Sequence, residues 1–146
     1  MAQAGFETAS MRMEPVHLIE IQAPLADVER IMAAVVAIDP LTMGKAYDSN
    51  AFQTAAGVER YRPRDGAVAG CEEDVRIRPG VVSLFFESCG GAEVVARIVE
   101  AVYQVHSYQE PVIRVAECLT GRTKGLDDRD NPHRWWNTTG DWKAKA

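Results

Sequence analysis

Three polar residues in the last third of the sequence could carry out chemistry. They are His106, Tyr108 and Glu110, at alternate positions in the segment 101–115, AVYQVHSYQEPVIRV. A histidine can act as an acid, a base or a ligand near neutral pH. The alternative is structural. His106 ends a helical pattern, where its side chain could bond the last helix carbonyls, and Pro111 starts a strand pattern. We favour the structural interpretation, in which these residues turn the chain beside a cleft.

Three arginines form a second candidate site. Arg60, Arg62 and Arg64 alternate along a segment that runs into a glycine-containing loop. Side chains with a period of two lie on one side of a strand, and guanidinium groups there could hold a phosphate or carboxylate. The opposing hypothesis is a solvated basic edge that blocks edge-to-edge pairing. Neither glycine-rich phosphate-binding motif occurs, so the sequence leaves both hypotheses open.

Other kinds of site have little support in the sequence. His17, His106 and His133 are far apart, and the acidic segment 127–133, DDRDNPH, lacks the glycine turn and final glutamate of a calcium loop. No G-x-S-x-G motif occurs. We therefore predict no metal ligand set, no cofactor and no catalytic residue, and an enzyme is the less favoured class.

Size and composition restrict the class of protein. A chain of 146 residues with 47% hydrophobic residues is expected to form one domain with its own core. The net charge of −5 argues against a general nucleic-acid binder. An odd number of cysteines, Cys71, Cys89 and Cys118, fits a reducing cytoplasm. No apolar run is long enough to span a membrane.

The elements that must position these residues follow from the apolar patterns. The predicted order is strand, helix, strand pair, strand, helix, strand. The strands are expected at 16–22, at 46–54 paired with VERYRP, at DVRIRP and VVSLFFES broken by Pro79-Gly80, and at PVIRVAECL; the helices are expected at 24–38 and around 94–102.

This order predicts an α+β fold of the ferredoxin-like, split βαβ type, with two helices on one face of an antiparallel sheet. Val82, Leu84 and Phe86 face one way and Phe85 the other, so both faces of the sheet are expected to be apolar. Oligomerisation would bury the face without helices.

The chain outside this unit has a different character. We expect residues 1–14 to be a flexible extension and 15–120 to be the folded domain. Residues 121–146 form a polar tail that carries Trp135, Trp136 and Trp142. Three tryptophans in a polar segment predict that part of the tail packs on the domain or on a neighbouring subunit.

Two motifs resemble a known family. The segment MGKAYDSNAFQTAAGVERYRPRDGA is similar to the G-Y-D-x-x-F-Q-T-x-G-x-G-x-F-R-P-x-x-G-A segment of small YqfO-type proteins, and HSYQEPVIRV is similar to their H-P-Y-E-E-P-x-x-x-V. These are stand-alone relatives of the CutA-like domain inserted in Nif3-type proteins, within the PII/CutA-like superfamily. The resemblance covers roughly residues 15–118. Ser107 replaces the proline of the second motif and Gln109 its first acid.

The resemblance implies a homotrimeric signalling or ligand-sensing module. In PII-type trimers the long loop between the second and third strands, here residues 55–73, reports on a ligand in an inter-subunit cleft. A small anionic metabolite or nucleotide would then be the ligand, and neither nucleic acid nor a membrane would be a partner. The arginines would bind the anion, and the site would be lined or braced by Tyr47, His106, Tyr108 and Glu110.

Two alternatives stay open. One is a divalent-metal-binding protein or an enzyme that uses His106 and Glu110. The other is a structural trimer that recruits a protein partner through its tail.

Overall fold

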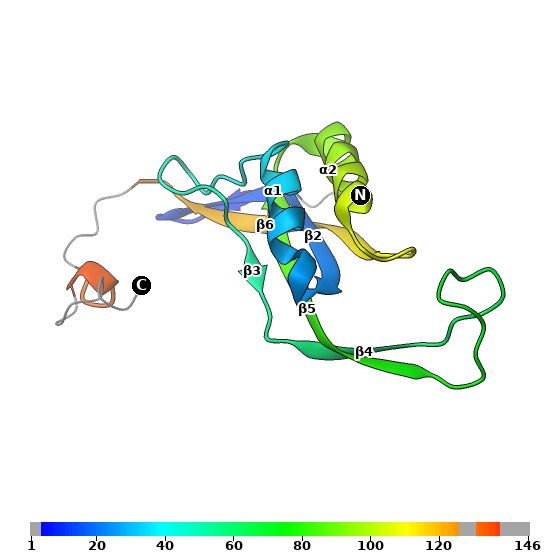
Figure 1. Cartoon of the computed structure of the whole chain (residues 1–146). Coiled ribbons are helices and arrows are strands. Elements are labelled where there is room, and N and C mark those ends of the chain that lie inside the picture. Colours follow the sequence, from blue (N-terminus) through cyan, green and yellow to red (C-terminus); the bar gives the residue numbers. More distant parts are fainter. Residues whose placement is uncertain (1–3, 126–130, 138–146) are drawn as a thin grey trace.

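The computed structural model describes residues 4–125 and 131–137 (Figure 1). The elements, in chain order, are β1 (Phe6–Glu7), β2 (Met11–Pro24), the 3-10 turn η1 (Leu25–Asp27), α1 (Val28–Val36), β3 (Phe52–Gln53), β4 (Gly57–Tyr61), β5 (Arg76–Ser88), α2 (Gly91–Val105), β6 (Val112–Thr123) and the 3-10 turn η2 (Trp135–Asn137).

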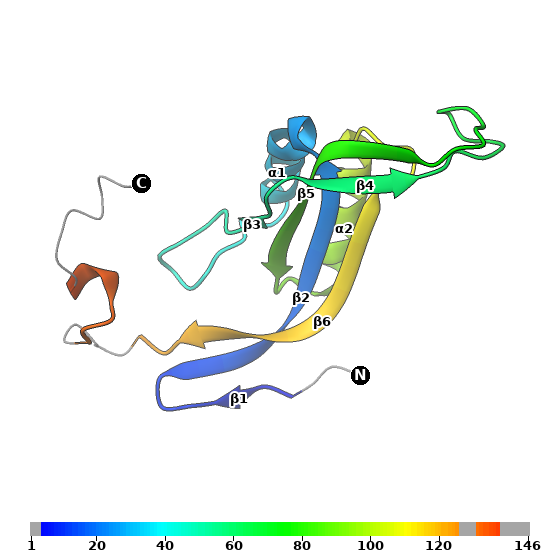
Figure 2. The ribbon, with the colours of Figure 1, turned by 90° about the horizontal axis from the view of Figure 1, so that it is seen from below.

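One antiparallel sheet carries both helices on the same face (Figure 1). Strand β2 lies between β6 and β5, β1 pairs with the start of β2, and both β3 and β4 pair with β5. Figure 2 shows β2 flanked by β5 on one side and β6 on the other. The predicted α+β, ferredoxin-like arrangement is therefore confirmed.

The core lies between the helices and one face of the sheet. Strand alternation places Ile19 and Ile21 of β2 on this face, opposite Phe86 and Leu84 of β5. Both helices turn an apolar stripe towards them, and Ile31 and Ile98 are among the residues with no exposed surface; Val28, Val35, Val95 and Val102 complete the two stripes.

The strands differ from the expected ones at several points. Only Phe52–Gln53 of the expected strand at 46–54 is a strand, and it pairs with β5. The VERYRP segment also pairs with β5 through β4. Strand β2 begins at Met11, so the end of the expected flexible extension is instead paired with β6.

Strand β5 runs without a break through Pro79 and Gly80. A register shift in the β4–β5 pair leaves Gly80 as an extra residue there, with a positive φ of 80° that glycine adopts easily. A proline is tolerated at such an irregularity because a ladder hydrogen bond is already missing. The expected break in the strand is therefore wrong, and the bulge has a different consequence.

The bulge exchanges the two faces of the hairpin. One extra residue changes the alternation, so Glu59 and Arg78, which are paired, lie on the same side as Val81 and Ser83. That side is continuous with the helix-free face of the sheet, since Ser83 pairs with Gln22 there. The β4–β5 hairpin consequently extends this face beyond the body of the molecule (Figure 1).

The helix-free face is mixed rather than apolar. Phe85 lies on it, half-buried, as expected. Beside it the carboxylate of Glu20 accepts hydrogen bonds from Arg114 at 3.0 Å and from Ser83 at 3.1 Å. Burial by itself raises the pKa of Glu20, but these hydrogen bonds and a third from Gln22 outweigh it, so the pKa is below 4.5. The expectation of an apolar face missed these polar groups.

The predicted tail starts inside β6, which runs to Thr123 and pairs with β2, and the described residues 131–137 contain the 3-10 turn η2. Trp135 and Trp136 lie edge to face within it, with ring centroids 5.2 Å apart. Trp142 lies outside the described residues. Docking of the tail on the domain or on a neighbour stays a prediction.

Among the described residues, no helix is long and apolar enough to cross a membrane.

Candidate functional site

A cleft of about 1080 Å³ lies between the β4–β5 hairpin and the corner that joins α2 to β6. The hairpin and its loop supply most of the lining, including Glu59, Tyr61 and Arg78. The corner supplies Tyr108 and Glu110. The floor comes from the helix-free face and is lined by Gln22, Val81, Ser83 and Val112. The volume suits a small organic ligand better than a bare inorganic ion.

Tyr108 joins the corner to the hairpin. Its hydroxyl donates a hydrogen bond of 2.5 Å to Oε1 of Glu59, and Arg78 Nε lies 3.6 Å from the same oxygen. The Arg78 guanidinium also lies over the Tyr108 ring, 4.9 Å from its centroid. A phenol, a carboxylate and a guanidinium therefore form one contact group at the inner end of the cleft.

Burial, together with the hydrogen bond to Glu59, raises the pKa of Tyr108 to about 12 and outweighs the opposite effect of Arg78. The phenol is consequently protonated at neutral pH. It acts as a hydrogen-bond donor rather than as a base.

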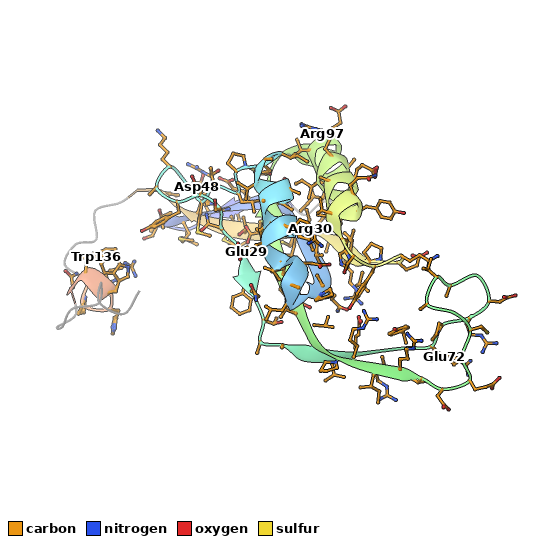
Figure 3. The ribbon with its side chains drawn as sticks, in the orientation of Figure 1. Glu29, Arg30, Asp48, Glu72, Arg97 and Trp136 are labelled. Carbon is orange, nitrogen blue, oxygen red and sulfur yellow. The ribbon has the colours of Figure 1, made fainter. Side chains whose placement is uncertain are left out.

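Tyr61 lies between two arginines further along the hairpin. Its hydroxyl oxygen accepts hydrogen bonds from Arg78 at 2.8 Å and from Arg76 at 3.3 Å. The hydrogen bond from Arg76 is the main reason why the pKa of Tyr61 lies below 10. Arg76 in turn pairs with Glu72 through two hydrogen bonds (Figure 3 labels Glu72 in the hairpin loop). Arg76 and Arg78 are thus already engaged within the chain.

The hairpin loop is attached to the corner across the cleft. The backbone N–H of Val68 donates a hydrogen bond of 2.8 Å to Oε1 of Gln109. The loop is also folded on itself, since the N–H of Glu72 donates to the carbonyl of Pro63 at 3.1 Å. The cleft is therefore bounded by two segments of the same chain that lie about forty residues apart in sequence.

His106 is a buried structural residue in this geometry. Its Nε2 lies 2.8 Å from the carbonyl oxygen of Gln22 in β2, and Nδ1 accepts a hydrogen bond from the backbone N–H of Tyr108 at 3.1 Å. These partners require a neutral ring with the proton on Nε2. Both nitrogens are engaged, which leaves none for a metal or for proton transfer. The sequence suggested that His106 would bond the last carbonyls of the helix. Its ring instead contacts strand β2.

Arg30 occupies the place expected for the histidine. Its Nε donates a hydrogen bond of 2.7 Å to the carbonyl of Val105, in the last turn of α2. Figure 3 shows Arg30 on α1, facing α2. Arg30 also pairs with Asp27 at 2.9 Å, so one arginine links the start of α1 to the end of α2.

Asp27 completes the support of the corner. This buried carboxylate accepts hydrogen bonds from the N–H of Ser107 at 2.9 Å and from its hydroxyl at 2.6 Å. Burial by itself raises the pKa of Asp27, but the hydrogen bonds from Ser107 and the Arg30 pair outweigh it and leave the pKa below 3.8. Ser107, the departure from the family motif, is therefore the residue that the aspartate holds.

The three arginines do not form a single row. Only Arg60 is in β4, which ends at Tyr61; Arg62 and Arg64 follow in the loop, on either side of the buried Pro63. Arg60 pairs with Ile77, so its side chain lies on the opposite side of the hairpin from Glu59. All three are exposed, and within residues 4–125 and 131–137 none has an ion-pair or hydrogen-bond partner through its side chain.

The two remaining predicted site residues, Glu110 and Tyr47, lie in different parts of the molecule. Glu110 is exposed at the rim of the cleft. Tyr47 is 62% exposed in the loop before β3, where it forms a short bridge with Met43. It does not line the cleft. The structure thus brings Tyr108 and Glu110 to the cleft and places His106 behind it.

Sequence reasoning missed Glu59, Tyr61 and Arg78. Glu59 and Tyr61 are the chain neighbours of Arg60, and Arg78 pairs with Glu59 across the hairpin. Their alternation in VERYR and VRIR was a visible signal, but its meaning depends on how the two strands pair across the bulge. No group of three metal-binding side chains occurs in the part of the chain that the structure describes.

The arrangement defines a known fold. A ferredoxin-like sheet with two helices on one face, and a long hairpin between its second and third main strands, is the PII/CutA-like fold. No protein-family model matches the sequence, and no curated protein is significantly similar to it.

Solved structures support this assignment of the fold. A NIF3-related protein from Bacillus cereus superposes with a TM-score of 0.61 at 16% identity, over 84% of this chain. The match spans only 31% of that protein's length. CutA from Xylella fastidiosa gives a TM-score of 0.52 at 17% identity over 70% of this chain and 83% of its own. The divalent ion tolerance protein CutA1 from Ehrlichia chaffeensis gives 0.50 at 12% identity, over 79% and 87%.

Proposed function

We propose that this chain is a trimeric, PII/CutA-like ligand-sensing module of the cytoplasm that binds a small anionic metabolite or nucleotide in the cleft between its hairpin and its α2–β6 corner. The observation that carries this proposal is the pair of unpartnered, exposed guanidinium groups of Arg62 and Arg64 at the rim of a cleft of suitable size. An exposed arginine without an internal partner can form bidentate bonds to a phosphate or carboxylate.

The charges and apolar residues of the cleft favour an organic anion, with one charged group and an apolar part. Glu59 is already compensated by Arg78 and by the Tyr108 hydroxyl. The lining includes Val81 and Val112, which lie on the same side of the sheet as Glu59. The anionic group would meet Arg62 and Arg64 at the rim, while the remainder of the ligand would lie against the valines and the Tyr108 ring.

The trimer is proposed because the cleft opens on the helix-free side of the sheet. That side keeps Phe85 half-buried and leaves Phe52 and Ala116 exposed. A second copy that covers this face would also lie beside the cleft, so the site would be between subunits. The hairpin loop, attached by Gln109, is the segment whose position would respond to the ligand.

A divalent-metal function is the second candidate, because one matching structure is called a divalent ion tolerance protein. The described residues offer it no ligand cluster, and His106 has no free ring nitrogen. A catalytic role for His106 and Glu110 lacks support for the same reason. Recruitment of a protein by the tail involves residues outside those described.

The test is thermal unfolding of the parent protein with phosphate, nucleoside mono- and triphosphates, di- and tricarboxylates, and divalent metals. We expect at least one organic anion to raise Tm. The double variant Arg62→Ala/Arg64→Ala should weaken that ligand at least about tenfold, since each lost charge-assisted bond costs roughly 1.5–3 kcal/mol.

The control is Arg97→Ala/Lys45→Ala, which removes the same charge from exposed positions on α2 and the loop before β3. Figure 3 labels Arg97 on the outer side of α2. This variant should bind like the parent. If no anion raises Tm, or if both variants weaken binding equally, the cleft is not the anion site.

A further inference from the structure

A second hollow lies on the helix-free face, at the end away from the cleft. Its volume is about 240 Å³, and the loop before β3 borders it. Strand pairing places Leu18, Phe52 and Phe85 on this face, and Phe52 is 67% exposed. Met43 of the loop, 43% exposed, completes the apolar lining. An apolar cavity of about 150 Å³ can hold one benzene ring, so this hollow has room for a tryptophan side chain.

One end of the hollow is polar. The carboxylate of Glu87 accepts a hydrogen bond from the Thr120 hydroxyl at 2.8 Å and another from Arg122 at 3.4 Å. A carboxylate has about four acceptor sites, so Glu87 can accept a further hydrogen bond. An apolar hollow with an acceptor at its rim fits an aromatic ring that carries an N–H group, and the side chain of tryptophan is such a ring.

All three tryptophans of the chain follow β6 in the tail. Trp135 and Trp136, the aromatic pair of η2, are each 44% exposed, and their rings lie edge to face. Asn131 orders this turn. Its side-chain oxygen accepts a hydrogen bond from the N–H of His133 at 2.9 Å, and its carbonyl accepts one from the side-chain amide of Asn137 at 2.6 Å. A pair that is already ordered loses little conformational entropy when it docks.

The tail leaves the domain beside the hollow. Arg122 lines the hollow, and Gly125 is three residues further along the chain, at most about 11 Å away. The connection from Gly125 to Asn131 adds a reach of about 20 Å. Figures 1 and 2 both show the loop before β3 and η2 on the same side of the molecule, where Figure 3 labels Asp48 and Trp136. The aromatic pair can therefore reach the hollow of its own copy.

We infer that the aromatic pair of the tail docks into this hollow of its own copy, with one indole ring against Phe52 and Phe85 and its N–H directed to Glu87. Docking removes the exposed surface of Phe52 and of the aromatic pair from water in one contact. The helix-free face thus carries an interaction surface for a segment of the same chain.

The docked tail and a ligand in the cleft do not exclude each other. Along β5 the hollow is lined by Phe85 and Glu87, whereas the cleft is lined by Val81 and Ser83. A neighbouring copy can still cover the part of this face around the exposed Ala116 of β6. The inference goes beyond anion binding and does not depend on it.

Tryptophan fluorescence tests the inference directly, because tryptophan occurs only in the tail. The probe protein is the full chain with Trp142→Phe, in which the aromatic pair holds the remaining tryptophans. We expect acrylamide to quench it at least about twofold less than the same protein with Phe52→Ala, and its emission to lie at shorter wavelength. Phe52 is exposed and outside the core, so this variant should keep its fold, which circular dichroism checks.

The matched control is Tyr103→Ala, which removes another exposed ring, from α2 on the other face of the sheet. It should leave quenching and emission unchanged. Met43→Ala, which also reduces the apolar lining of the hollow, should change both in the same direction as Phe52→Ala. It gives the answer if Phe52→Ala unfolds.

Equal quenching in the probe protein, Phe52→Ala and Met43→Ala would overturn docking in the hollow and leave the aromatic pair to a partner protein. An effect of Tyr103→Ala as large as that of Phe52→Ala would also overturn it, because the change would not be local to the hollow. A difference that disappears on dilution would place the pair in a neighbouring copy and overturn the contact within one copy. The anion titration above decides the proposed function separately.

Discussion

At the scale of single residues, the corner at 106–111 is held by side chains that bond to backbone. The His106 ring joins β2 to the N–H of Tyr108, Asp27 holds Ser107, and Arg30 covers the end of α2. The result is a rigid support that presents Tyr108 to the cleft. Tyr108 contacts the hairpin, so it is the residue through which the corner affects the candidate site.

His106→Ala should lower the free energy of unfolding by about 2 kcal/mol, because it removes a buried side chain and leaves a partly buried carbonyl and a partly buried N–H without their partner. Anion binding should change by less than about tenfold, which corresponds to 1.4 kcal/mol. Urea unfolding and ligand titration measure both. The partly exposed His17, which forms only a 3.9 Å contact with Glu117, provides the control, and His17→Ala should cost less than His106→Ala. A variant that unfolds like the parent yet binds nothing would make His106 a functional residue.

Asp27 gives the protein an acid-sensitive contact. Its pKa in the folded state lies below 3.8, so the folded state takes up this proton less readily than the unfolded chain. Its contribution to stability is therefore complete above pH about 4 and is lost as pH falls through the lowered pKa. Asp27→Asn should cost about 2 kcal/mol at pH 7 and flatten the fall in Tm below pH 4. A variant with the parent's acid profile would show that other carboxylates control it.

At the scale of elements, the β4–β5 hairpin is the feature that creates the cleft. Its bulge at Gly80 places Glu59, Tyr61 and Arg78 on the side of the helix-free face. The strand pair without the extra residue would carry these side chains on the other side. One backbone irregularity thus decides which residues line the site.

Gly80→Ala should destabilise the protein by about 1 kcal/mol, because a residue with a Cβ is strained at a φ of 80° even though space is open. Gly57 on the paired strand is the matched control. A Cβ there would be 3.6 Å from the carbonyl oxygen of Val81, an ordinary contact, so Gly57→Ala should change stability by less than about 0.5 kcal/mol. Urea midpoints at equal protein concentration compare the two. Equal effects would mean that the bulge relaxes easily.

At the scale of the whole molecule, the helices cover one face of the sheet and leave the other to a partner. Leu18 and Phe85 lie on that face. Beside them, Glu20 accepts a hydrogen bond from Ser83, and Glu87 accepts one from Thr120. A mixed face of this kind suits a specific interface better than an apolar one, because the charged groups are already hydrogen-bonded within the subunit.

Ala116 tests whether the proposed trimer covers this face. It is exposed on β6 and pairs with Leu18, so Ala116→Glu would place an unpaired charge in the interface and should reduce the trimer to monomers. Ala96→Glu on the exposed side of α2 should leave the mass unchanged. Light scattering with both variants gives the answer, and a trimeric Ala116→Glu protein would place the interface elsewhere.

The sequence by itself determined the order of the elements, the two helices and the buried face of the central strands. Those features depend on local periodicity, which Val82, Leu84 and Phe86 show directly. It also indicated that the corner at His106 is structural, since Pro111 and the helical pattern meet there.

Only the tertiary structure decided which polar residues share the cleft. Arg60 and Arg78 look alike in the sequence, yet the pairing of β4 with β5 places them on opposite sides of the hairpin. Asp27 meets Ser107 across 80 positions, and Tyr108 meets Glu59 across 49. Such contacts arise from strand register and from the packing of distant segments, and no local pattern encodes either one.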